Sequence, residues 1–147
     1  MEERAFVAWI GASVAVHFTR AYPDFDGQSM SLILLVEDEE MLREVVAESL
    51  TSLGFEVVSA ANAADGLESF KRQTPDLVLS DIRMPGGDGV SLLESIRKSS
   101  KIPVVLMTGF SDLTDAECRA RGASAVLHKP FNQAALESVL RGLVPLA

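Results

Sequence analysis

The sequence predicts an α/β fold in which five parallel strands form one doubly wound sheet, in the order 2-1-3-4-5, with helices on both faces. From Ser31 onward, short apolar segments alternate five times with segments of helical periodicity. The apolar segments include continuous apolar runs, as expected of parallel strands buried on both faces. Right-handed crossovers leave few arrangements for five such units, and this order suits them.

The first two units are the most regular. Residues 32–36 read Leu-Ile-Leu-Leu-Val, and apolar residues then recur at helical spacing over residues 41–53. Residues 55–59 form the second predicted strand. Asn62 can cap the helix that follows, and Pro75 prevents that helix from continuing.

The remaining units follow the same alternation of strand and helix. They are a strand over residues 76–80, a helix over 90–96, a strand over 102–107, a weaker helix over 111–121, a strand over 124–128 and a last helix over 131–143.

The first thirty residues differ from the rest. Residues 5–18 form an apolar run that is too short to span a bilayer comfortably, and residues 1–4 lack the positive charge of a secretory signal. Three interpretations stay open: an appended helix that docks on a partner or a second copy, a membrane-surface anchor, and an extension upstream of a true start at Met30. We therefore expect residues 1–30 to be an extension of unknown role and residues 31–147 to form the functional domain.

The charge and the cysteine content of the chain limit the kinds of partner that it can have. The chain carries 13 Lys and Arg against 21 Asp and Glu, a formal charge of −8. That balance argues against direct binding to nucleic acid or to anionic lipid, since both need a basic face. Cys118 is the single cysteine, which excludes an internal disulfide and fits a reducing cytosol. We expect a cytoplasmic protein with no nucleic-acid partner and no membrane insertion.

Polar residues able to do chemistry follow four of the five predicted strands. They are Glu37 and Asp38 after the first strand, Asp81 after the third, Thr108 after the fourth and Lys129 after the fifth. Each has a plain alternative as a helix-end charge, a turn former, a cap or a solvated loop residue. Because the carboxyl ends of parallel strands meet at one edge of the sheet, the joint placement favours a site there.

Three carboxylates close together repel one another, and a cation between them relieves that repulsion. Oxygen ligands of this kind suit Mg²⁺. One of the carboxylates can then act as a nucleophile on phosphorus. The ammonium of Lys129 and the hydroxyl of Thr108 would help neutralise the transferred phosphoryl group.

With these residues in place, the chain from about Ser31 to Leu143 resembles a response-regulator receiver domain of the stand-alone type, with a flavodoxin-like fold. The motifs that carry the resemblance are Glu37-Asp38, Asp81 with Met84-Pro85 and Asp88-Gly89, Thr108-Gly109, and Lys129-Pro130-Phe131.

The resemblance implies a role for each of these positions in two-component signalling. Asp81 would accept a phosphoryl group from a sensor histidine kinase or a histidine phosphotransfer protein. Asp38, Asp81 and the Arg83 backbone carbonyl would bind Mg²⁺ directly, and Glu37 would act mainly through water. Thr108 and Lys129 would sense the phosphoryl group, and the bond before Pro130 would be cis.

The sequence departs from the family pattern in two ways. The fifth strand often carries an aromatic residue three positions before the lysine, and Val126 stands there. The signalling surface is formed by the fourth helix, the fifth strand and the fifth helix. We therefore expect it to respond to phosphorylation by a different or smaller shift. The protein target that it binds is unknown. Arg83 and Phe110 occupy the variable positions that should overhang the acyl phosphate.

Other functions fit the sequence less well. A haloacid-dehalogenase-type phosphohydrolase also uses a nucleophilic Asp with Mg²⁺, but it wants a second acid where Arg83 stands. A flavodoxin-like cofactor binder needs a phosphate-cradling loop after the first strand, and the acids over residues 37–40 would repel that phosphate. A homodimer stays open.

We expect Phe110 to shield the phosphoryl group from water and so to give a long-lived phosphorylated form. Phe110→Ala should then lose its phosphoryl group faster than the wild type. The decay of the two labelled proteins, followed side by side, checks this; equal lifetimes, or a slower variant, would remove the idea.

Overall fold

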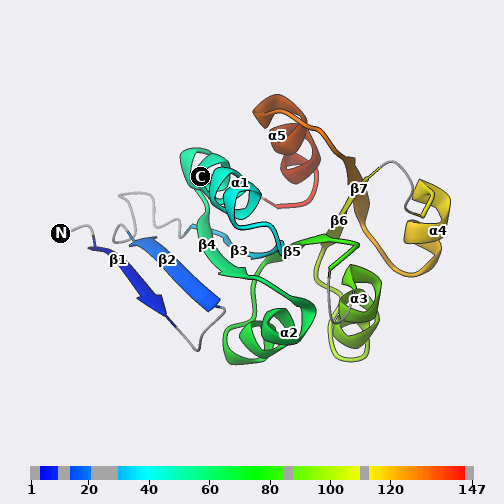
Figure 1. The fold of residues 1–147 in the computed structure, drawn as a ribbon, viewed down its shortest axis with the longest axis horizontal. Coiled ribbons are helices and arrows are strands. Elements are labelled where there is room, and N and C mark those ends of the chain that lie inside the picture. The colour runs from blue at the N-terminus through cyan, green and yellow to red at the C-terminus, as the bar shows by residue number, and fades with distance from the viewer. Residues whose placement is uncertain (1–3, 10–13, 21–29, 85–87, 110–112, 145–147) are drawn as a thin grey trace.

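The structure is a computed structural model, and it describes residues 4–9, 14–20, 30–84, 88–109 and 113–144. Within these ranges a seven-stranded sheet runs through the middle of the molecule, in the order β1-β2-β4-β3-β5-β6-β7 (Figure 1).

Five of these strands are parallel and confirm the predicted fold class. In sheet order they are β4 (Glu56–Ala60), β3 (Leu32–Val36), β5 (Leu77–Asp81), β6 (Val104–Thr108) and β7 (Ala125–His128). Counted along the chain from β3, this is the predicted order 2-1-3-4-5. In β3, β4, β5 and β6 every residue is buried, which explains their largely apolar sequences.

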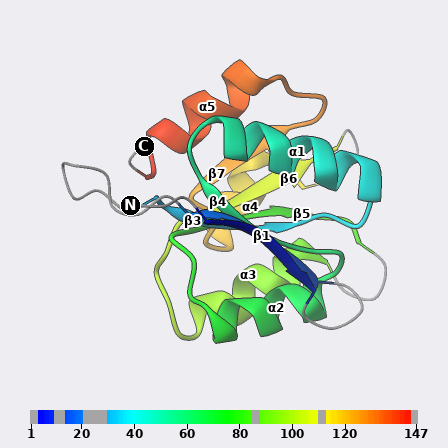
Figure 2. The same ribbon diagram turned by 90° about the vertical axis from the view of Figure 1, so that its left-hand side faces the viewer.

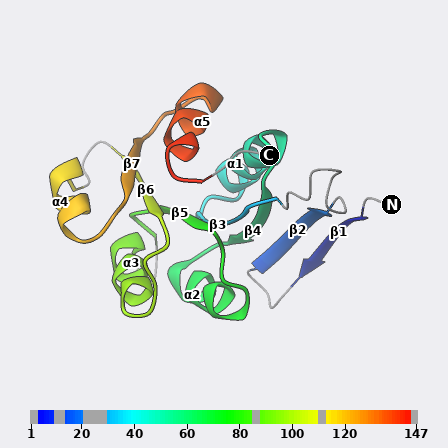
Figure 3. The same cartoon turned by 180° about the vertical axis from the view of Figure 1, so that it is seen from behind.

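Helices cover both faces of the sheet. On one face lie α1 (Glu40–Ser52) and α5 (Gln133–Arg141), and on the other lie α2 (Ala63–Arg72) and α3 (Gly89–Arg97) (Figure 2). The short α4 (Asp115–Ala120) lies beside β7, at the end of the sheet opposite the N-terminal strands (Figure 3). Each face has its own cluster of buried apolar side chains, so the sheet separates two cores.

The helix interpretation of residues 5–18 is wrong for the residues that the structure describes. They form β1 (Arg4–Trp9) and β2 (Val14–Arg20), which pair antiparallel, and β2 pairs antiparallel with β4. The segment is rich in β-branched and aromatic residues, which favour strands, and β4 offered it an open edge. Among the described residues no helix is long and apolar enough to cross a membrane.

Strand register determines which polar residues become neighbours. Val36 on β3 lies opposite Ser80 on β5. The residues that follow them, Glu37 and Asp81, therefore lie next to each other at the carboxyl end of the two strands. On the other side of β5, Thr108 ends β6 opposite His128 at the end of β7. The predicted convergence at one edge is therefore a consequence of pairing.

The start of α3 is packed directly against the end of β5. Asp88 caps this helix by accepting a hydrogen bond of 2.8 Å from the backbone N–H of Ser91. The Gly89 backbone N–H donates to the Ile82 carbonyl at 2.7 Å, and a Cβ added to Gly89 would lie 2.1 Å from the Asp81 carbonyl oxygen. Only glycine fits there without moving the backbone that carries Asp81.

Gly89→Ala should lower the free energy of unfolding by about 1–3 kcal/mol or more, because the added methyl group has to push the backbone of β5 aside. Urea unfolding followed by circular dichroism measures this. Gly142→Ala is the matched control: its Cβ would meet nothing nearer than the Val139 carbonyl at 3.8 Å. Equal stability of the two variants would contradict the packing described.

Candidate functional site

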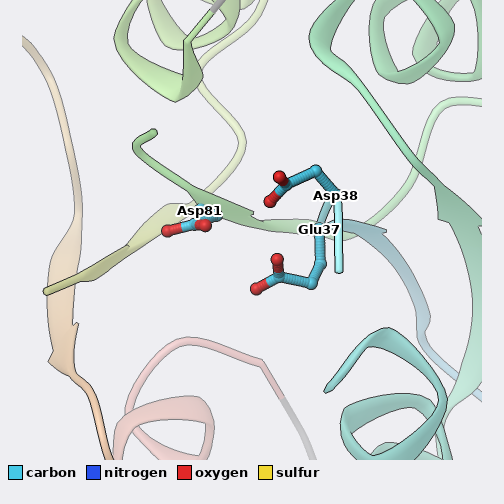
Figure 4. Close-up of side chains that lie close together, drawn as sticks. All are labelled: Glu37, Asp38 and Asp81. Atoms are coloured by element: carbon cyan, nitrogen blue, oxygen red, sulfur yellow. The ribbon is translucent and has the colours of Figure 1, made fainter. Parts of the chain in front are cut away.

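Three carboxylates meet at the carboxyl end of the parallel strands. One oxygen atom from each of Glu37, Asp38 and Asp81 lies within 4.8 Å of the others, and their side chains converge in Figure 4. Glu37 is 1% exposed and Asp81 is 7% exposed, whereas Asp38 is exposed. The cluster is thus open to solvent on the Asp38 side and closed behind Glu37 and Asp81.

The ammonium of Lys129 lies between the two buried carboxylates. Its Nζ is 2.9 Å from Oε1 of Glu37 and 3.1 Å from Oδ2 of Asp81. The second oxygen of each carboxylate accepts a backbone hydrogen bond, Glu37 from the N–H of Glu39 at 3.1 Å and Asp81 from the N–H of Ile82 at 2.9 Å. Both acids are therefore held in fixed orientations.

Burial and like charge act against ionisation of these acids. Burial raises the pKa of Glu37, an effect that hydrogen bonds from Glu39 and Lys129 only partly offset and that nearby Asp81 reinforces. Burial likewise raises the pKa of Asp81 despite its interactions with Lys129. Burial alone would lower the pKa of Lys129, but hydrogen bonds to Glu37 and Asp81 raise it. The site therefore keeps a positive charge beside acids that are reluctant to ionise.

The donor set fits a magnesium ion. When all four groups are ionised, three carboxylates and one ammonium leave two negative charges, which a divalent cation balances. All three carboxylates offer hard oxygen ligands, and exposed Asp38 leaves a path from solvent.

The other predicted site residues lie around this cluster. Thr108 is 1% exposed at the end of β6, and its hydroxyl lies 3.1 Å from Nδ1 of His128. Arg83 is exposed in the loop after β5, and the role of its carbonyl stays a prediction. The Lys129–Pro130 bond is cis, as the resemblance implied. Phe110 and Pro85, two of the residues named from the resemblance, fall outside the described residues.

His128 was not among the predicted site residues. It precedes Lys129 at the end of β7, and its side chain is 65% exposed. Yet its Nδ1 contacts Thr108 and its Nε2 lies 2.8 Å from Oδ1 of Asp115. The signal available in the sequence was the pairing of the last residues of the fourth and fifth strands, which brings Thr108 and His128 together.

The raised pKa values predict how pH and Mg²⁺ act on stability. Because Glu37 and Asp81 have higher pKa values in the folded chain than in the unfolded one, their contribution to stability is largest below their ordinary values of about 4. It is lost as pH rises through the raised values. Since Mg²⁺ requires the ionised acids, we expect it to reverse this slope, adding about 2.7 kcal/mol at one hundred times its dissociation constant.

Urea unfolding between pH 4 and 8, with and without Mg²⁺, measures both effects. Glu37→Gln is the matched variant, since it keeps the shape of the side chain and removes one titrating group. Without Mg²⁺, the stability of the wild type relative to this variant should fall as pH rises. If the stability of the wild type relative to Glu37→Gln increases over this pH range, or if Mg²⁺ does not change it, the pKa shifts described above are wrong.

Comparison with known proteins agrees with this geometry. The family profile described as "Response regulator receiver domain" matches residues 33–141. The chain is 34% identical over 113 residues to the probable transcriptional regulator ycf27 of Porphyridium aerugineum, and 36% identical over 113 residues to the transcriptional regulatory protein CseB of Streptomyces coelicolor. Each alignment covers 76% of this chain, against 47% and 48% of the relatives, so the chain spans about half the length of the curated relatives it matches.

Comparison with solved structures agrees with the match to this family. The chemotaxis protein CheY4 of Vibrio cholerae superposes with a TM-score of 0.73 at 28% identity, covering 79% of this chain and all of that one. The receiver domain of a sensor histidine kinase from Pseudomonas aeruginosa, solved with a magnesium ion in its active-site cleft, gives 0.71 at 33% identity, covering 78% and 98%. With the strand order, the carboxylate cluster and the family match in agreement, the chain belongs to the response-regulator receiver domain family.

Proposed function

We propose that this chain is a phosphorylation-switched receiver that accepts a phosphoryl group on Asp81 in a magnesium-dependent reaction. The observation that carries the proposal is the placement of the Asp81 carboxylate between two other acids and the ammonium of Lys129. A structural carboxylate would gain nothing from two acidic neighbours, whereas a phosphoacceptor needs a cation and an ammonium beside it.

The donor in this proposal is a phosphohistidine of a sensor kinase or of a histidine phosphotransfer protein. An oxygen of Asp81 attacks phosphorus, the P–N bond of the phosphohistidine breaks, and the imidazole leaves with the electron pair of that bond. The product is an acyl phosphate on Asp81. Lys129 faces Oδ2 of Asp81, so its ammonium can follow the negative charge onto the phosphoryl oxygens.

Asp38, Asp81 and the carbonyl of Arg83 would hold the magnesium ion, with Glu37 acting mainly through water. When bound, the ion supplies positive charge that neutralises the phosphoryl oxygens. Glu37 fits a supporting role because it accepts hydrogen bonds from Lys129 and from the backbone of Glu39 and so holds the ammonium beside Asp81. Exposed Asp38 is better placed to exchange a water molecule for the cation.

Access to Asp81 and the response to its phosphorylation use different surfaces in this proposal. Beside the site, α1 presents two exposed apolar side chains one turn apart, Met41 (76% exposed) and Val45 (57% exposed), which suit docking of a donor protein. The face formed by α4, β7 and α5 would bind the protein target or pass the signal on. Val126 packs against the core there, so a smaller movement than that of an aromatic ring is expected.

The finer assignments belong to the same proposal. Residues 31–147 form the receiver, residues 1–30 are an extension, and the protein works in the cytoplasm as a signalling domain that catalyses only its own phosphorylation and dephosphorylation. The curated relatives are named as transcriptional regulators. The expectation of no nucleic-acid partner was made from the acidic composition of this chain and concerns this chain alone. An enzyme that hydrolyses phosphate monoesters is disfavoured because Arg83 stands where such an enzyme wants a second acid.

Asp81→Asn should remain folded and accept no phosphoryl group from acetyl phosphate or from a phosphorylated kinase, because an amide is no nucleophile for phosphorus. Incorporation of radioactive phosphate measures this, and Asp76→Asn is the control, since Asp76 lies at the opposite end of β5 and pairs with the backbone of Leu32. Labelling of Asp81→Asn at the level of the wild type would move the acceptor elsewhere.

A further inference from the structure

His128 connects the hydroxyl at the end of β6 with the first turn of α4. The distances are 3.1 Å from its Nδ1 to Oγ1 of Thr108 and 2.8 Å from its Nε2 to Oδ1 of Asp115. Thr108 is almost fully buried, whereas the side chains of His128 and Asp115 are more than half exposed. A hydrogen-bonded chain of three residues thus runs from the sheet edge to a surface helix.

The carboxylate fixes the direction of these hydrogen bonds. An ionised carboxylate only accepts, so the nitrogen that faces Asp115 must carry a hydrogen. In a neutral imidazole the other nitrogen, Nδ1, then has no hydrogen and is an acceptor. With the ring neutral, the hydroxyl of Thr108 donates its hydrogen to Nδ1 of His128.

We infer that His128 is a positioning residue for Thr108. In the unphosphorylated protein, His128 accepts the hydrogen bond of the Thr108 hydroxyl. When Thr108 breaks that hydrogen bond, the change reaches Asp115 on α4 through His128. This inference rests on the proposed function of Asp81. It also supplies a route from the site to the α4 surface that does not use an aromatic residue at position 126.

A phosphoryl group on Asp81 changes what the hydroxyl must do. Its oxygens accept hydrogen bonds, so Thr108 has to turn its hydrogen from Nδ1 toward them. The O–H bond stays intact throughout. Nδ1 of His128 then loses its donor, and the pair of His128 and Asp115 is no longer tied to the end of β6.

The surroundings of His128 leave room for this change. A hollow of about 310 Å³ beside it gives the ring room to adjust. The charged groups among the described residues that line this hollow with His128 are Asp115 and Lys129, and Lys129 is engaged by Glu37 and Asp81. Asp115 is therefore the side chain through which a change at His128 reaches α4.

The nitrogen chemical shifts of the histidine rings test this directly. The chain has two histidines, and His17→Gln removes the other signal. The protein of residues 1–147 is measured at constant pH with Mg²⁺, before and after beryllofluoride, a phosphoryl mimic whose binding is followed independently by fluorine NMR. Before addition His128 should be the Nε2–H tautomer, with Nδ1 accepting the hydrogen bond from Thr108. After addition the Nδ1 signal should move downfield, as expected of an imidazole nitrogen that has lost its donor.

Two variants at position 108 decide whether the hydroxyl carries the effect. Thr108→Ser keeps the hydroxyl and should keep the shift of the Nδ1 signal, whereas Thr108→Val keeps the shape, has no hydroxyl to donate and should show no shift at saturating beryllofluoride. If beryllofluoride binds and the Nδ1 signal does not move, or moves equally with valine, the inference is overturned while the proposed function stands. If beryllofluoride does not bind the wild type, both are overturned.

Discussion

The ammonium of Lys129 allows Glu37 and Asp81 to lie side by side in a nearly closed part of the molecule. Removing one partner from a buried ion pair costs about 3–5 kcal/mol in general, because the remaining charge has lost its solvent. Here the ammonium contacts both carboxylates at 2.9 and 3.1 Å, and Asp38 adds a third acid at the open side. When all four groups are ionised, Lys129 therefore balances only one of the three negative charges of this cluster.

Strand pairing and the packing of α3 position these groups relative to one another. The pairing of β3 with β5 brings Glu37 next to Asp81, and the pairing of β6 with β7 brings Thr108 opposite His128. Gly89 lets α3 begin directly against the backbone of Asp81. The chain of hydrogen-bonding partners Thr108, His128 and Asp115 connects this edge of the sheet with α4.

The sequence alone allowed the five parallel strands, their order and the carboxylate cluster to be predicted, because each depends on local patterns: apolar runs, helix caps and a polar residue after a strand. The N-terminal hairpin could not be predicted this way. The strand character of residues 4–9 and 14–20 becomes decisive only once the edge of β4 is available for pairing. His128 escaped prediction for a similar reason, since its importance comes from a neighbour across the sheet rather than along the chain.

Whether the buried carboxylate of Asp81 carries phosphate can be tested chemically. The protein is phosphorylated with Mg²⁺ present, the acyl phosphate is converted by hydroxylamine into a stable hydroxamate, and the modified residue is located by mass spectrometry. We expect modification at Asp81, and none without Mg²⁺. Modification at Glu37 or Asp38 instead, or labelling that does not depend on Mg²⁺, would show that Asp81 is not the magnesium-dependent acceptor.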